Sequence, residues 1–210
     1  MNHVSRDVVP FSFDLSSLAP RTIASLYSHL VTRPTGRALR LGIESQIGDL
    51  GARCLSVLDF TQVVVLDYSC ADEAVAKLLQ RYRGGDGHDV YFVARGLGEQ
   101  HREPIETVLT RHGLSLVAEV EDTRFVLLGE ATSLERIVWA ALESTAAGDV
   151  KEIAGTAQCA ANDAAGALDR LAERRVVLRN TSGRYYALSG LLGPDGLRGP
   201  AGPARTATND

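Results

Sequence analysis

The segment from Leu66 to Glu73, Leu-Asp-Tyr-Ser-Cys-Ala-Asp-Glu, decides how the first part of this chain is expected to fold. It joins an apolar run that ends at Leu66 to a stretch of helical periodicity that begins at Ser69. The expected inner face of that helix consists of Ala71, Ala74, Val75, Leu78, Leu79 and Tyr82. The segment therefore predicts a strand, a polar corner and an amphipathic helix in direct succession.

Strands and helices alternate on both sides of this corner. Strands are expected at 8–13, 54–60, 63–66 and 90–94, followed by a hairpin of 116–120 and 125–128. Helices are expected from Pro20 to Arg33, from an N-cap at Thr35, from Ser69 to about 83, and around Pro104. Arg33 is expected to end the first helix, because a residue before a proline avoids helical geometry. The alternation predicts an α/β fold, a mixed sheet with helices packed on it.

The pattern changes near Glu130, where three helices precede a second hairpin. The first helix begins at Thr132 and Ser133, and its expected inner side consists of Leu134, Ile137, Val138, Ala141 and Leu142. Asp149 is expected to cap the second helix, and the third covers about 160–175. Strands at 176–179 and 184–188 complete the order of a winged helix-turn-helix. We therefore expect an α/β domain over 8–130, a small winged-helix domain over 133–190, and a disordered tail over 193–210.

Three short segments carry a family resemblance that covers residues 10–130. They are 36–40, 57–60 and 64–73, and the strongest part is the Leu-Asp-Phe strand end followed by Leu-Asp-Tyr-Ser-Cys-Ala-Asp-Glu before a helix. In these segments the chain resembles the STAS-like domains. The resemblance implies a bacterial protein-binding switch. Familiar members are anti-sigma-factor antagonists, which bind kinase-like ATPases and are phosphorylated on serine.

The corner differs from the Asp-Ser-Ser-Gly pattern of the more familiar STAS domains. Tyr68 stands where the first serine would be and Cys70 where the glycine would be, while Ser69 keeps a hydroxyl in the loop. The resemblance implies a phosphoacceptor or partner-binding surface made of Ser69, Asp67, Cys70, Asp72 and Glu73. The residues alone also allow plainer roles, with Ser69 as an N-cap and Cys70 as a small buried side chain rather than a reactive thiol.

Side chains suited to catalysis or metal binding form no recognised motif. The five histidines and three cysteines lack metal-ligand spacing. Gly84 to Gly87 follows a helix and lacks the lysine of a phosphate-binding loop, so a turn is expected there. Asp59 and Asp67 each end a strand, and a nucleotide-handling enzyme, the least favoured alternative, would depend on them. We therefore expect no cofactor, no metal site and no enzymatic activity.

The charge of the C-terminal part bears on DNA binding. Residues 133–210 contain nine basic and nine acidic side chains, whereas a DNA-binding domain usually needs a basic face. The candidates for nucleic-acid contact are Asn162, Arg170, Arg174, Arg175, Arg179 and Arg184. The sequence therefore leaves the output of this domain open between DNA contact and packing against the first domain or a protein partner, with the arginines in surface ion pairs.

The overall composition excludes several classes of protein. A net charge of −4 argues against a general polyanion binder, and no apolar run approaches the ~20 residues of a transmembrane helix. Sparse cysteines fit a reducing compartment, so a cytoplasmic protein with no membrane contact is expected. The leading hypothesis is a non-enzymatic regulator whose first domain recognises a partner protein. The rival is a DNA-binding transcription regulator that uses its first domain for dimerisation or sensing, and the oligomeric state stays open.

Overall fold

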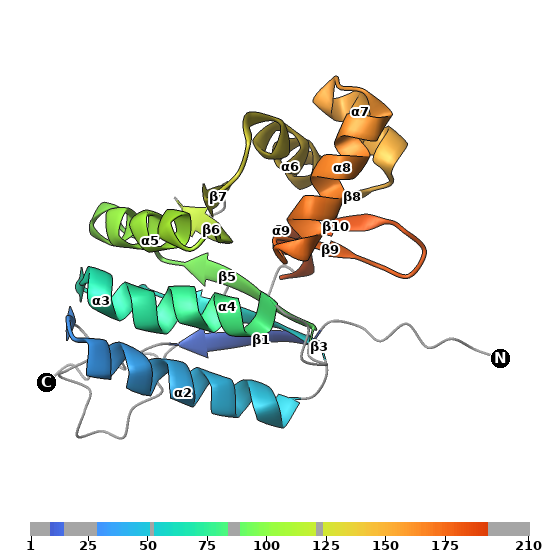
Figure 1. The fold of residues 1–210 in the computed structure, drawn as a ribbon. Helices are drawn as coiled ribbons and strands as arrows, with labels where there is room; N and C mark the ends of the chain where they lie inside the picture. Colours follow the sequence, from blue (N-terminus) through green and yellow to red (C-terminus); the bar gives the residue numbers. More distant parts are fainter. Residues whose placement is uncertain (1–8, 15–28, 51–52, 84–88, 121–123, 193–210) are drawn as a thin grey trace, which may run out of the picture.

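A five-stranded sheet forms the centre of the molecule in a computed structural model that describes residues 9–14, 29–50, 53–83, 89–120 and 124–192 (Figure 1). Its strands, in spatial order, are β1 (Val9–Asp14), β3 (Arg53–Asp59), β5 (Asp89–Arg95), β6 (Ser115–Val120) and β7 (Arg124–Gly129). The first four strands are parallel, and β7 pairs antiparallel with β6. The chain is therefore a mixed α/β protein, as the alternating pattern predicts.

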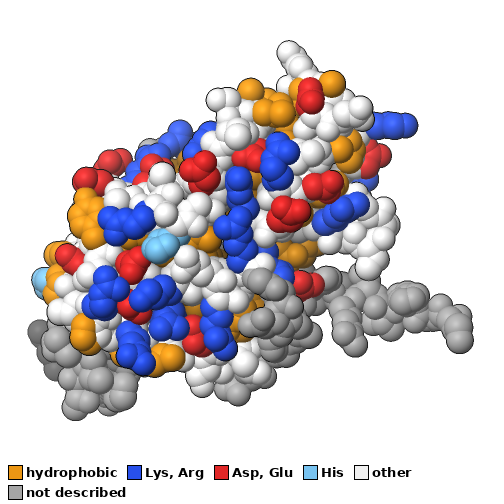
Figure 2. Space-filling view, in the orientation of Figure 1, with side chains coloured by type: hydrophobic (Ala, Val, Ile, Leu, Met, Phe, Trp, Pro, Cys, Tyr) orange, Lys and Arg blue, Asp and Glu red, His pale blue; other side chains and the backbone are white. Residues whose placement is uncertain are grey.

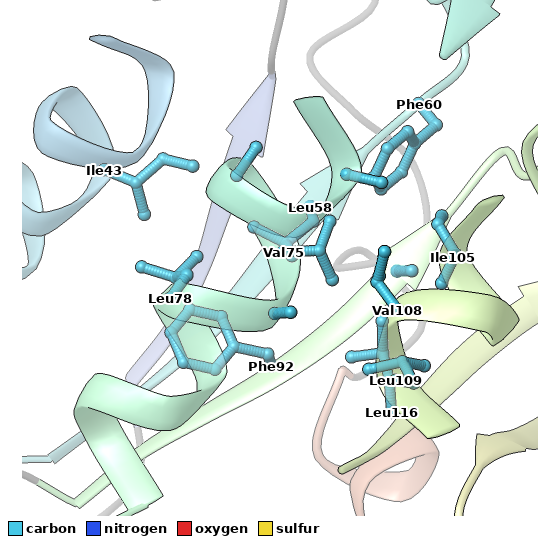
Figure 3. Close-up of a cluster of buried hydrophobic side chains, with 14 of the residues drawn as sticks. Ile43, Leu58, Phe60, Val75, Leu78, Phe92, Ile105, Val108, Leu109 and Leu116 are labelled. Atoms are coloured by element: carbon cyan, nitrogen blue, oxygen red, sulfur yellow. The ribbon is translucent and has the colours of Figure 1, made fainter. Parts of the chain in front are cut away.

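One face of the sheet is covered by helices from the first part of the chain. They are α2 (Arg33–Leu50), the continuous helical stretch of α3 (Tyr68–Ala71), η1 (Asp72–Ala76) and α4 (Lys77–Arg83), and α5 (Glu99–Arg111). Figure 3 shows side chains of these helices meeting alternate strand residues such as Leu58 and Phe92. This apolar layer fixes the position of the corner before α3.

The other face of the sheet is covered by the C-terminal part of the chain. Its elements are α6 (Ser133–Thr145), β8 (Ala147–Gly148), α7 (Val150–Ala157), α8 (Ala161–Glu173), β9 (Val177–Arg179), β10 (Tyr185–Ala187) and α9 (Leu188–Leu191). Successive strand residues point to opposite faces, and Leu55, Val57, Tyr91 and Val93 join the apolar cluster of these elements. A domain boundary is expected at 130–133. In the structure this connection joins the sheet to a C-terminal part that shares one hydrophobic cluster with it.

Several local predictions about the first part of the chain are wrong. The helix expected from Pro20 lies outside the described residues as far as 28, and His29–Leu30 forms the short strand β2 instead. β2 pairs with β4 (Val65–Leu66) in a separate two-stranded sheet, so only two residues of the expected strand 63–66 belong to a strand. α2 begins at Arg33, because a proline is tolerated in the first helical turn, and the Thr32 hydroxyl accepts from the backbone amide of Thr35 at 3.3 Å.

Two further features differ from the sequence interpretation. Residues Asp72–Ala76 are π-helical rather than α-helical, and β8 adds a third strand beside β10. Ile137, expected on the inner side of its helix, is 51% exposed. The predicted turns at Gly84 to Gly87 and 121–122, and the predicted disordered tail over 193–210, lie outside the described residues. Among the helices of the described part, none has the length and apolar character needed to cross a bilayer.

Candidate functional site

The corner before α3 is closed by Asp67 rather than by Ser69. The Asp67 carboxylate accepts from the backbone amide of Ser69 at 2.6 Å, and the Asp67 amide donates to the carbonyl of Leu30 at 2.8 Å. The Ser69 hydroxyl and the Ser69 amide both lower the pKa of the Asp67 carboxyl group. The interpretation of Ser69 as the N-cap is therefore wrong, since Asp67 takes that position and Ser69 follows inside the first turn.

Four large apolar side chains are exposed around this corner. Of the six such side chains in the described residues, these four are Val31, Val64, Val65 and Tyr68, which are 44%, 57%, 40% and 41% exposed. The pairing of β2 with β4 places Val31 next to the corner, because Leu30 pairs with Leu66, and the other three lie within five residues of one another in the sequence. We call this set the apolar corner. Exposed clusters of this kind are typical of contact surfaces.

Tyr68 joins the apolar corner to α5 through its hydroxyl group. That hydroxyl donates to the Glu103 carboxylate at 2.8 Å, and the hydrogen bond raises the pKa of Tyr68. The ring remains exposed while its polar end is held. Tyr68 therefore presents an oriented aromatic surface directly before Ser69.

Cys70 lies behind the corner and is fully buried. Burial, followed by the negative charges of Asp67 and Glu73, raises the pKa of the thiol to about 12. A thiol that stays protonated is a poor nucleophile. The geometry thus favours the prediction of a packing residue over that of a reactive cysteine.

Asp72 and Glu73, predicted to contact a partner, are instead buried beneath basic side chains. Arg33 donates to Asp72 at 3.1 Å and to Glu73 Oε1 at 3.0 Å, and Lys77 donates to the same oxygen of Glu73. The imidazole of His112 lies 2.7 Å from Asp72. These carboxylates hold α2, η1 and α5 together, and the cations above them face solvent.

The pKa values of both carboxyl groups reflect these contacts. Burial by itself raises the pKa of Asp72, but hydrogen bonds from His112 and Arg33 outweigh it, so the pKa is lowered. The hydrogen bond from Lys77 is the main cause of the lowered pKa of Glu73, with Arg33 contributing further. Both groups are therefore held as carboxylates.

Asp59, the other strand-end carboxylate, is engaged locally. Its side chain accepts from the amide and the hydroxyl of Thr61, at 2.9 and 2.5 Å, and forms an ion pair with Arg95. Burial raises the pKa of Asp59, but these hydrogen bonds lower it below its ordinary value. Asp59 and Asp67 thus each have their own structural partners. Within the part of the chain that is described, no three His, Cys, Asp or Glu side chains are grouped to hold a metal ion.

The arginines predicted to contact DNA all form ion pairs in the structure. Glu135 is fully buried, and it accepts from Arg170 at 2.6 Å, from Arg174 at 3.0 Å and from the amide of Thr132 at 2.8 Å. Burial raises the pKa of Glu135, but these hydrogen bonds prevail and lower it to about 2. Arg170 and Arg174, two of the residues predicted to contact DNA, thus pair with a buried carboxylate.

The remaining arginines of this group also form ion pairs. Arg175 lies 2.9 Å from Asp89 and over the ring of Tyr91, which attaches the end of α8 to the sheet. Its φ of 58° at the residue after the helix cap is a geometry that usually selects glycine. The other two pairs are Arg179 with Asp169 at 3.1 Å and Arg184 with Glu152 at 3.2 Å. Asn162 lies exposed in the first turn of α8.

The sequence interpretation missed the apolar corner and the buried carboxylate of Glu135, whereas it weighed ion pairs of the arginines as an alternative to DNA contact. Val64 and Val65 have the apolar character of core residues in the sequence, but in the structure they are 57% and 40% exposed. No protein-family model matches the chain, and a search of curated proteins finds no relative. The fold defines a mixed α/β protein with a sheet covered on both faces.

Proposed function

We propose that this chain is a non-enzymatic bacterial regulatory protein. In this proposal residues 8–130 form a STAS-like domain that binds a partner protein, and residues 133–190 form a winged-helix-like module that delivers the output. The observation that carries the proposal is the apolar corner, which lies next to Ser69. A cluster of exposed apolar side chains costs solubility unless a partner covers it.

The order of elements supports both fold assignments within this proposal. The strand, corner and helix at 53–83 agree with the expected STAS-like arrangement. The C-terminal part has three helices and a hairpin, and β8 completes a small three-stranded sheet with β10 and β9. That arrangement is typical of winged-helix modules.

The arginine contacts favour protein over DNA as the target of the C-terminal module. A DNA-binding surface gains affinity from cations that neutralise phosphates. Here Arg170 and Arg174 hold Glu135, and Arg175 holds Asp89. Residues 133–210 also contain as many acidic as basic side chains, so we propose a protein contact for the output.

Ser69 is the proposed modification site within the partner-binding surface. Its hydroxyl and amide both hydrogen-bond to the Asp67 carboxylate. A phosphate added to Ser69 would therefore lie against a carboxylate and repel it. We expect phosphorylation to open the Asp67 cap and so to change the shape of the apolar corner.

The test is capture of partners from native lysate on the immobilised full chain, with and without nuclease. Val64→Ser should abolish capture, whereas Ile137→Ser should not, because Ile137 is equally exposed but lies on α6. The phosphomimetic Ser69→Asp should alter the amount captured. Capture that survives Val64→Ser, or that disappears with nuclease, would contradict the proposal.

A further inference from the structure

A group of basic side chains borders the apolar corner on α2 and α4. It consists of Arg33, Arg37, Arg40, Lys77 and Arg81, and we call it the basic face. These five cations outnumber the three carboxylates between them, Glu44, Asp72 and Glu73. Figure 2 shows blue side chains gathered over this part of the surface.

The carboxylates of this region lie underneath, and the cations other than Arg40, whose side chain is 18% exposed, lie outside. The side chains of Glu44, Asp72 and Glu73 are 13%, 12% and 6% exposed. In contrast, those of Arg33 and Arg81 are 55% and 57% exposed. The positive charge therefore faces solvent even though most of the cations are paired.

α2 combines these cations with exposed apolar side chains. Arg33, Arg37 and Leu41 follow one another at intervals of one turn, so they lie along one stripe about 12 Å long. Leu41 is 49% exposed, and Arg37 has no ion-pair partner among the residues that the structure describes. With Val31 just before the helix, the stripe is both apolar and basic.

We propose that the partner docks on this stripe and the apolar corner with an acidic amphipathic helix. The proposal rests on the proposed function, since it specifies the chemistry of the partner that the apolar corner binds. Apolar side chains of the partner would cover Val31 and Leu41, and carboxylates one turn apart would meet Arg33 and Arg37. Complementary charge of this kind sets orientation and rate of association.

Nucleic acid and membrane fit the same surface less well. The excess of cations is only two, and a polyanion would leave Leu41 and Val31 uncovered. A bilayer would require α2 to insert an apolar side, but its apolar stripe of Leu39, Ile43 and Ile47 is buried in the core. An acidic helix satisfies both the cations and the apolar side chains.

The experiment uses two synthetic helical peptides of about five turns as probes. Both carry leucine at i, i+3, i+4 and i+7, and the remaining positions are glutamate in one peptide and lysine in its twin. Fluorescence anisotropy measures their affinity for the full chain. We expect the glutamate peptide to bind about tenfold more tightly than the twin, and more weakly as salt rises from about 50 to about 500 mM.

Three variants show where on the surface the glutamate peptide binds. Arg37→Glu and Leu41→Ser should each weaken the glutamate peptide about tenfold, whereas Lys151→Glu, the same charge change on α7, should leave it unchanged. Equal affinity for the two peptides, affinity that ignores salt, or binding that survives Arg37→Glu would overturn the proposal. So would preferential binding of the full chain to anionic lipid vesicles or duplex DNA through Arg37.

The outcome separates this proposal from the proposed function. If Val64→Ser abolishes capture of a protein from lysate while Arg37→Glu leaves that capture intact, the regulatory function stands and the acidic-helix proposal fails. If Val64→Ser also leaves capture intact, the proposed function itself fails.

Discussion

Buried carboxylates lie beneath half-exposed arginines in both parts of the molecule. On α2, Arg33 is 55% exposed and pairs with Glu73, whose side chain is 6% exposed. On α8, Arg170 is 49% exposed and pairs with Glu135, which is fully buried. The two regions differ in their balance of charge, because the five cations of the basic face outnumber the three carboxylates between them, whereas residues 133–210 contain nine side chains of each sign. The excess of cations, and not the pairing itself, therefore distinguishes the two surfaces.

The largest effect on stability is expected where the carboxylate is most deeply buried. Glu135→Ala removes the bond to the Thr132 amide and two charged hydrogen bonds, and it should lower the free energy of unfolding by about 3 kcal/mol. Glu44→Ala in the basic face should cost about 1 kcal/mol, since Arg81, one of its two partners, is mostly exposed. Urea denaturation of both variants measures the difference. Equal losses of unfolding free energy in the two variants would contradict the expectation that the more deeply buried carboxylate contributes more.

The acid dependence of stability should follow from the same carboxylate. The pKa of Glu135 is about 2 in the folded protein and 4.5 ordinarily. Its stabilisation is therefore complete above pH 4.5 and is lost as the pH falls from about 4.5 to about 2. In Glu135→Gln the free energy of unfolding should therefore change less with pH over this range. A profile identical to that of the unmodified chain would show that Glu135 is not the responsible group.

The next effect tests the close approach of α2 to the corner. A Cβ atom at Gly36 would lie 2.8 Å from the Cys70 carbonyl oxygen and 2.9 Å from the Cβ of Glu73. Gly36→Ala should therefore destabilise the protein by about 2 kcal/mol, although alanine favours helices. Gly48→Ala, in the same helix but with open space around it, should stabilise by about 0.5 kcal/mol. Thermal denaturation of the pair decides between crowding and helix propensity.

A second glutamate on α6 should behave in the opposite way to Glu135. Burial raises the pKa of Glu143, and only the Ser189 hydroxyl opposes this, while Oε2 has no hydrogen-bond partner. Its contribution is present at acid pH and is lost as the pH rises through its raised folded pKa. Glu143→Gln should therefore stabilise the protein by about 1 kcal/mol at pH 7. A destabilised variant at pH 7 would argue for a charged partner.

The smallest effect on stability is expected on the basic face itself. Arg37 is exposed and makes no ion pair among the described residues, so Arg37→Glu should change the free energy of unfolding by less than about 0.5 kcal/mol. Unchanged denaturation together with weakened peptide binding would identify a contact residue. A large loss of stability would instead show that Arg37 contributes to the folded structure itself.

Local signals predicted much of the fold. The strand at 54–60 and the helix caps at Thr132 and Asp149 were predictable because each depends on residues close in sequence. The cap at the corner was not, since Asp67 and Ser69 are both good caps and only the backbone geometry chooses between them.

Non-local contacts explain what could not be predicted about the site. Glu135 and Arg170 are 35 residues apart, and Arg33 and Glu73 are 40 residues apart. No local pattern shows that these side chains meet. The C-terminal part also covers the second face of the sheet, which no periodicity in a single strand reveals.

Whether the chain contacts a protein at the apolar corner or nucleic acid at α8 is tested most directly by site-specific photo-crosslinking of the full chain in native lysate, from position 64 and from position 162. We predict a protein adduct at position 64 that resists nuclease and is lost with Arg37→Glu, and no nucleic-acid adduct at position 162. A nucleic-acid adduct at position 162 with no protein adduct at position 64 would contradict the proposed protein-binding function.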